Sequence, residues 1–81
     1  MSRYTVLLYR EPDESAYNVV VPSMPGCFTY GATVDQALER AREAMEGWLI
    51  AERDRGGDIP EEDAPPIVAS VELTELAATP A

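Results

Sequence analysis

The side chains of this chain that could do chemistry are carboxylates and one thiol, because the sequence contains no histidine and no lysine. Without these bases, most general acid–base and phosphoryl-transfer mechanisms lack a group to move the proton or hold the phosphate. Cys27 is the only cysteine, and with no base near it in the sequence its thiol has no evident activator. We therefore interpret Cys27 as a packing residue and expect no catalytic residue, no cofactor and no metal site.

Four carboxylates are the candidates for an alternative, a magnesium-dependent nuclease, because magnesium prefers oxygen ligands. Asp13 and Glu14 lie in a short segment typical of turns, and Asp35 and Glu39 are four residues apart near the start of an amphipathic segment. A turn former and a favourable charge at a helix N-terminus explain the same residues without any catalysis. We favour this structural interpretation and keep the nuclease as an alternative.

The charge of the chain restricts its partners. Fifteen acidic residues stand against six arginines, which gives a net charge of −9. This balance argues against binding to nucleic acid or to anionic membranes, since both need a basic surface. Two interpretations remain: the acidic residues keep a small protein dispersed, or they attract a basic partner.

The pattern of residues predicts an α+β fold with the order β-β-β-α-β. Residues 4–9, 16–21 and 27–30 are rich in β-branched and aromatic side chains and predict an antiparallel, hairpin-based sheet. Thr33 predicts the N-cap of a helix of about twenty residues that packs on one face of the sheet, and Gly56-Gly57 predicts its end. Residues 67–73 alternate between apolar and polar side chains and predict a fourth strand, which we expect to pair with the first.

The length of 81 residues predicts a single domain over residues 1–81, with a core at 3–73 and a frayed tail at 74–81. So short a chain has a thin core, and with no disulfide available we expect a homodimer or a higher homo-oligomer. No apolar run is long enough for a membrane span, and the N-terminus does not resemble a signal peptide. A single unpaired cysteine suits a reducing compartment, so we expect a cytoplasmic protein.

Two groups of residues are candidates for binding a partner. Met24 and Phe28 lie at a Pro-rich corner between the second and third strands, where they either pack on the helix or face a partner. The acidic residues Asp58, Glu61, Glu62 and Asp63 lie in a proline-rich connection after the helix. They are either a solvated loop or a docking strip for a basic surface.

The ordered series of these segments resembles the HicB family of small bacterial antitoxins. The resemblance covers about residues 3–73 and lies in the second strand with Pro22, in Pro25-Gly26-Cys27, in Thr29-Tyr30-Gly31, and in Gly57 with Ile59-Pro60. It implies a degenerate ribonuclease-H-like fold without a catalytic centre. It also implies a partner, a small basic HicA-like toxin that cleaves messenger RNA and that the antitoxin masks by direct binding.

One departure from the family pattern concerns DNA binding. Many members of the family carry a C-terminal helix-turn-helix or ribbon-helix-helix module, whereas only eight residues follow Leu73 here. We therefore expect no C-terminal DNA-binding module and no direct contact with nucleic acid. Two alternatives to an antitoxin remain: a magnesium-dependent ribonuclease-H-like nuclease, and an oligomeric domain that has no toxin.

Overall fold

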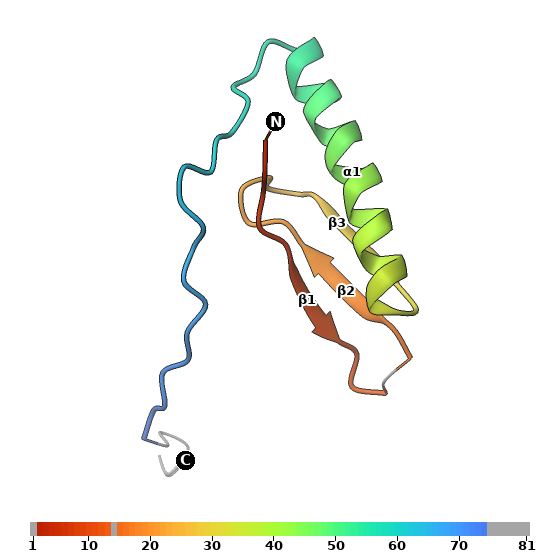
Figure 1. The fold of residues 1–81 in the computed structure, drawn as a ribbon, viewed down its shortest axis with the longest axis vertical. Coiled ribbons are helices and arrows are strands. Elements are labelled where there is room, and N and C mark those ends of the chain that lie inside the picture. The colour runs from red at the N-terminus through yellow and green to blue at the C-terminus, as the bar shows by residue number, and fades with distance from the viewer. Residues whose placement is uncertain (1, 14, 75–81) are drawn as a thin grey trace, which may run out of the picture.

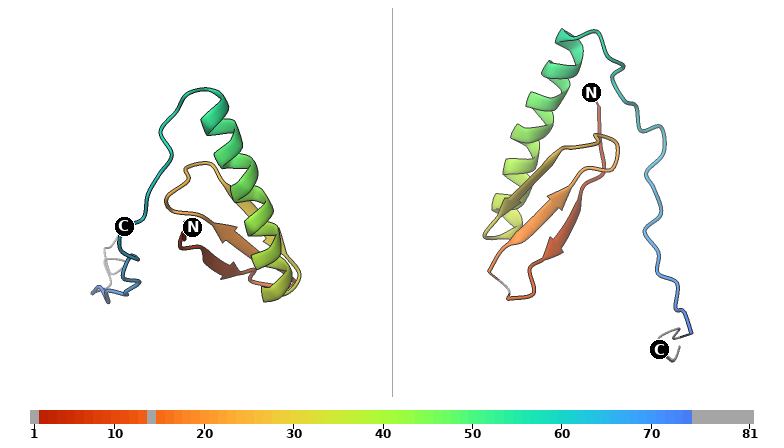
Figure 2. Two further views of the ribbon diagram at one scale, coloured as in Figure 1. Left: turned by 45° about the horizontal axis from the view of Figure 1, so that its top comes forward. Right: turned by 180° about the vertical axis from the view of Figure 1, so that it is seen from behind.

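A computed structural model describes residues 2–13 and 15–74 of the chain. Three strands, β1 (Leu7–Arg10), β2 (Tyr17–Val20) and β3 (Phe28–Gly31), precede one helix, α1 (Val34–Asp54). The strands form one antiparallel sheet in the order β1-β2-β3. The helix lies across one face of this sheet (Figures 1 and 2), where it packs mainly against β3 and β2. The predicted α+β class, the hairpin-based sheet and the single covering helix are confirmed.

The core is small and consists of two neighbouring clusters. Val19 of β2 packs with Ala37 and Ala41 of α1, and all three side chains are buried. The second cluster lies under the corner between β2 and β3, and its buried members are Val21, Met24 and Cys27. The two clusters share Val6 and Met45 as half-buried neighbours, so they form one continuous core.

Gly31 lets the start of α1 lie directly against the end of β3. A Cβ atom at Gly31 would lie 2.6 Å from Ala37 Cα and 2.9 Å from the carbonyl carbon of Gln36. Ala37 presents the smallest side chain that still favours a helix, so backbone can approach backbone here. Glycine is required at this position by close approach, whereas the described glycines with a positive φ angle are Gly26 and Gly56.

The corner between β2 and β3 is held by backbone bonds and by one side chain of α1. Met24 N–H donates to Val21 O and Cys27 N–H donates to Met24 O, both at 3.0 Å, and Gly26 adopts a φ of 83°. Trp48 Nε1–H donates to Pro25 O, also at 3.0 Å, which fastens the corner to the helix. The corner is therefore a rigid part of the core rather than a projecting loop.

The helix begins and ends where the sequence predicts. Thr33 Oγ1 accepts a hydrogen bond from Gln36 N–H, and Gln36 Oε1 accepts one from Ala32 N–H. These bonds satisfy amide groups that the first turn leaves without helical partners. Gly56 follows the C-cap Arg55 with a φ of 75° and donates its N–H to Arg53 O, which terminates α1.

The predicted fourth strand is absent from the sheet. Residues 67–73 are extended but have no strand as a neighbour, and they leave the body of the molecule in all three ribbon views (Figures 1 and 2). Ile67, Val71 and Leu73 are more than 80% exposed. The alternation identifies a sequence suited to a strand, but a strand also needs a partner for its backbone. Among the described residues of this chain no strand pairs with it.

Glu62 ties the connection after α1 to the segment leading into β1 and to the corner between β2 and β3. Thr5 Oγ1 donates to Glu62 Oε2 at 2.5 Å, and Thr5 N–H donates to both carboxylate oxygens at 3.1 Å. Ser23 Oγ adds a bond to Oε1 at 3.1 Å, and Tyr4 Oη donates to Pro60 O at 2.6 Å. The donated bonds, first of all that of the Thr5 hydroxyl, lower the pKa of Glu62 below its ordinary value.

Substitution of Gly31 by alanine tests the close approach of helix and sheet. We expect Gly31→Ala to lower the free energy of unfolding by about 1–3 kcal/mol, because the methyl group overlaps the backbone of Ala37. Gly47→Ala is the matched control, since nothing lies within 4 Å of its added Cβ. In mid-helix it should stabilise the protein by about 0.5–1 kcal/mol. Urea denaturation of both variants measures the difference, and equal effects would contradict the predicted close contact.

Acid should weaken the tie made by Glu62. Because its folded-state pKa is lowered, the carboxylate contributes stability above its unfolded-state pKa, and this contribution is lost as the pH falls through the folded-state value. The melting temperature of the native chain should therefore fall from about pH 5 to pH 3 more steeply than that of Glu62→Gln. Glu61→Gln removes an exposed neighbour and should retain the native slope. If the melting temperature fell equally steeply with pH in all three proteins, the hydrogen bonds of Glu62 would not contribute to stability.

Candidate partner-binding surface

The face of the sheet opposite α1 is uncovered and carries aromatic side chains. Strand alternation points Leu7 and Tyr9 of β1, Asn18 and Val20 of β2, and Phe28 and Tyr30 of β3 to this face. The register aligns them in two rows across the sheet, Leu7–Val20–Phe28 and Tyr9–Asn18–Tyr30. We call these six residues the open sheet face.

The three aromatic residues of the open sheet face are its most exposed large side chains. Phe28 is 68% exposed, Tyr30 58% and Tyr9 56%. Tyr30 is partly held in place by α1, because the Arg40 guanidinium lies 5.2 Å from its ring centroid and donates to its carbonyl oxygen at 3.3 Å. Exposed aromatic side chains on a rigid sheet are typical anchors of protein interfaces.

The structure separates Phe28 from Met24, the other residue predicted at the corner. Met24 is fully buried and packs with Val21 and Cys27, with Trp48 among its neighbours. A partner cannot reach its side chain in this structure, so Met24 belongs to the core and only Phe28 remains on the surface. Cys27 is also buried, as predicted, and burial raises the pKa of its thiol.

The four acidic residues of the connection after α1 also divide into exposed and half-buried side chains. Asp58, Glu61 and Asp63 are exposed, whereas Glu62 is half-buried and bonded to Thr5 and Ser23. Glu61 to Asp63 line a shallow groove with Ser2, Arg3 and Tyr4 from the N-terminal segment. Three of the four carboxylates are therefore exposed, and the fourth is held by hydrogen bonds to Thr5 and Ser23.

The carboxylates that suggested a nuclease do not form a metal site within the described residues. Asp13 accepts hydrogen bonds from the hydroxyl and the N–H of Ser15, which lower the pKa of the Asp13 carboxyl. Asp35 lies in the first turn of α1, and Glu14 lies outside the described residues. In residues 2–13 and 15–74 no three histidine, cysteine or acidic side chains come together as a metal ligand set. Nor does this part of the chain contain a helix long and apolar enough to cross a membrane.

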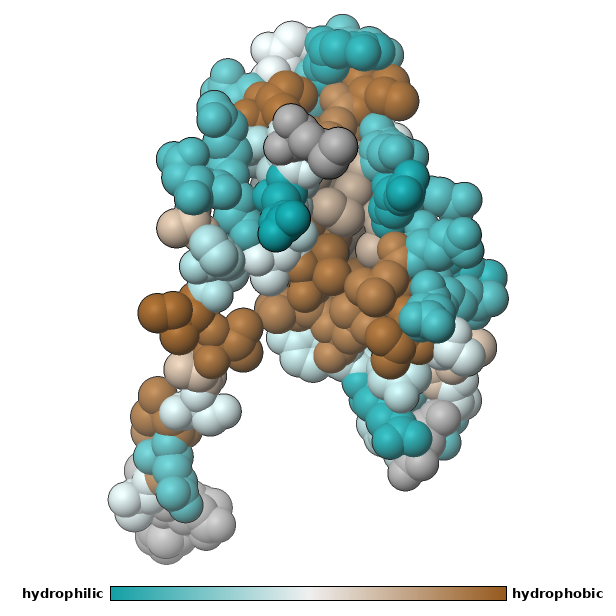
Figure 3. Space-filling view, in the orientation of Figure 1, coloured by the Kyte–Doolittle hydropathy of each residue, from teal (hydrophilic) through white to brown (hydrophobic). Residues whose placement is uncertain are grey.

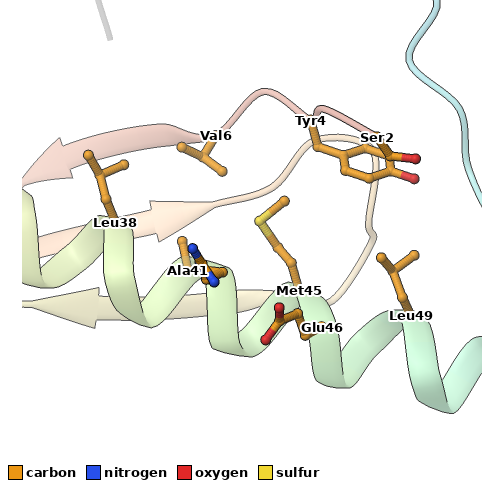
Figure 4. Close-up of a pocket in the computed structure, with 9 residues that line it drawn as sticks. Ser2, Tyr4, Val6, Leu38, Ala41, Met45, Glu46 and Leu49 are labelled. Atoms are coloured by element: carbon orange, nitrogen blue, oxygen red, sulfur yellow. The ribbon is translucent and has the colours of Figure 1, made fainter.

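A groove on the helix side of β1 is a further feature of the surface. It has a volume of about 290 Å³ and lies between the segment leading into β1, which contributes Tyr4 and Val6, and the helix. Figure 4 shows Leu38, Met45 and Leu49 of α1 lining its other side, and Figure 3 shows apolar residues gathered there. Because α1 lies over β3 and β2, these three residues lie at the edge of the core.

Comparison with known proteins assigns the chain to a family. The family model described as the HicB-like antitoxin of bacterial toxin–antitoxin systems matches residues 4–78. A UPF0150 protein of Thermoplasma acidophilum is 38% identical over 63 residues, which cover 76% of this chain and 88% of that protein. A UPF0150 protein of Archaeoglobus fulgidus is 44% identical over 45 residues, covering 54% of this chain and 65% of that protein.

A UPF0150 protein of Synechocystis is 38% identical over 63 residues, covering 74% of this chain and 75% of that protein. The family match extends over nearly all of the chain and includes the sheet, the corner, the helix and the acidic connection. This protein therefore belongs to the HicB-like antitoxin family of bacterial toxin–antitoxin systems.

Proposed function

We propose that this protein neutralises a small, basic, messenger-RNA-cleaving toxin of the HicA-like type by binding to it directly. The observation that carries the proposal is the match to the HicB-like antitoxin family over residues 4–78. The chemistry of the surface supports it, since the chain combines a net charge of −9 with an uncovered apolar sheet face. On this account the protein acts by occlusion and performs no reaction of its own.

The exposed carboxylates of the acidic connection account for attraction to such a toxin. Asp58, Glu61 and Asp63 point into solvent from a loop that Glu62 fastens to the sheet. A preformed acidic loop speeds encounter with a basic protein and disfavours acidic competitors. This contribution falls with rising salt, because exposed charges are screened.

The open sheet face accounts for the part of the affinity that is not electrostatic. Phe28 and Tyr30 already stand exposed on a hydrogen-bonded sheet, so burying them costs little ordering of the chain. Aromatic side chains of this kind often contribute most of the binding free energy of an interface. We propose that Phe28 is the anchor and that the acidic loop orients the toxin around it.

The direct experiment uses the purified chain and a HicA-like toxin encoded beside its gene. We expect a complex by isothermal titration calorimetry and stoichiometric inhibition of the toxin's cleavage of RNA. The same assay run with this chain alone and magnesium tests the nuclease alternative. Cleavage by the chain alone that Asp13→Asn or Asp35→Asn abolishes would replace the proposal, and binding without inhibition would refute the occlusion mechanism.

Neutralising the exposed acidic loop should slow association with the toxin. We expect the triple variant Asp58→Asn, Glu61→Gln, Asp63→Asn to lower the association rate about tenfold at low salt. The control Glu39→Gln, Glu43→Gln, Glu46→Gln makes the same change of charge on exposed positions of α1. Stopped-flow measurements over a range of salt concentrations compare the two. Equal slowing by both triples would show that net charge alone matters and that the loop has no particular role.

Truncating Phe28 tests the aromatic anchor. Phe28→Ala should weaken toxin binding by roughly 30-fold, the usual effect of removing a hot-spot side chain, and mainly by faster dissociation. Ile50→Ala on α1 removes an apolar side chain that is 50% exposed and should leave the affinity within about threefold. Unchanged binding by Phe28→Ala would place the toxin elsewhere.

A further inference from the structure

The segment over residues 67–73 has the composition of a half-buried strand but lies in solvent. Ile67 is 91% exposed, Val71 82% and Leu73 81%. The residues between Ile67 and Val71 carry no charge, so the exposed segment is largely uncharged. Its alternation directs Ile67, Ala69, Val71 and Leu73 to one side and Val68, Ser70 and Glu72 to the other. An exposed apolar strand of this kind is a template for pairing with another chain.

The outer edge of β1 is the site in the same fold that suits such a strand. Glu11 N–H donates to Ala16 O at 2.9 Å, so the backbone groups of Glu11 face β2. In an antiparallel pair, successive residues turn their backbone groups alternately toward and away from the neighbouring strand. The backbone groups of Leu8, three residues before Glu11, therefore face away from β2, toward the edge of the sheet where no further strand lies. The opposite edge differs, because the carbonyl oxygen of Tyr30 in β3 already accepts from Arg40 of α1.

The groove beside β1 suits the apolar side of the same strand. Tyr4 and Val6 form one wall, and Leu38, Met45 and Leu49 form the other, so its lining is mainly apolar (Figure 4). A strand added to the edge of β1 directs alternate side chains to the helix side of the sheet. Side chains on the helix side therefore fill the groove, and the others join the open sheet face.

The chain's own segment is poorly placed to reach this site. Glu62 is bonded to Thr5, and Ile67 follows Glu62 by five residues, the same interval that separates Thr5 from Arg10. At about 3.3 Å per residue, an extended chain running alongside β1 brings Ile67 level with Arg10, where β1 ends. The apolar segment then passes beyond the groove of its own chain.

The residues between Glu62 and Ile67, which we call the hinge, oppose a turn of the segment back onto its own β1. The hinge contains Ala64-Pro65-Pro66, and a residue that precedes proline is pushed toward extended backbone. Two consecutive prolines continue this extension, so the hinge does not supply the tight reversal that pairing within one chain requires. The Glu62 anchor and the hinge together direct the segment away from its own β1.

We propose that residues 67–73 pair with the β1 edge of a second copy of this chain, which donates its own segment in return. Each groove then receives Ile67, Ala69, Val71 and Leu73 of the other copy, and both exposed edges are covered at once. Reciprocal exchange closes a two-fold dimer and leaves no unpaired end for further growth. The proposal concerns the protein alone and holds whether or not it binds a toxin.

Two charged substitutions on opposite sides of the segment test the exchange. Val71→Asp places a carboxylate in the groove of the other copy and should raise the dimer dissociation constant by roughly a hundredfold or more. Val68→Asp introduces the same group three residues earlier, at a position also exposed in the single chain, and should change the constant by less than about threefold. Sedimentation equilibrium measures the dimer dissociation constants of the native chain and of the two variants. A native chain that stays monomeric at every concentration, or equal effects of the two variants, would overturn the proposal.

The identity of the donating chain needs a separate measurement. In a sample mixed from isotope-labelled and unlabelled copies, we expect nuclear Overhauser contacts between Val71 of one copy and Val6 or Leu38 of the other. Contacts found only within one copy would show that the segment closes on its own chain and would overturn the exchange.

Discussion

A single helix must cover one face of a three-stranded sheet, and it is too narrow to bury that whole face. The rest of the structure depends on this limit. The helix lies close to the sheet because Gly31 has no side chain and because Ala37 and Ala41 present only methyl groups. Close packing over β3 and β2 excludes water from a small core, but it leaves β1 at the margin. A chain of this length buries about 60–65% of its unfolded surface, so some apolar surface must remain outside.

The uncovered surface is concentrated in three places, and each suits association. The open sheet face presents Phe28 and two tyrosines, the groove beside β1 is lined by the edge of α1, and residues 67–73 carry their apolar side chains in solvent. Our proposals assign the first to a toxin and the other two to a second copy. The assignments are compatible, because the groove lies on the helix side of the sheet and Phe28 lies on the other.

Local signals in the sequence predicted the elements well, and the failures have physical causes. Thr33 and Gly56 marked the helix ends because caps depend on nearby backbone groups. Gly31 serves close packing, a role that only the position of α1 reveals. The strand predicted at residues 67–73 depended on a pairing partner, and a pattern of side chains does not specify one.

The candidate site was only partly predictable for the same reason. Phe28 and the acidic loop could be selected from residue type, but Met24 could not be separated from Phe28 until the corner was seen to fold under Trp48. Similarly, four acidic residues looked alike in the sequence, and hydrogen bonds from Thr5 and Ser23 distinguish Glu62 as the anchor. The open sheet face required the register of all three strands, which joins residues far apart in the chain.

The central claim is that association completes the apolar surface that α1 leaves uncovered. Amide hydrogen exchange of the full chain at high and low protein concentration tests it most directly, because protection reports paired backbone groups. The account predicts that Leu8 and alternate amides of residues 67–73 are protected in concentrated protein and lose this protection together on dilution, while the core amide of Val19 stays protected. Unprotected exchange of residues 67–73 at every concentration would contradict it.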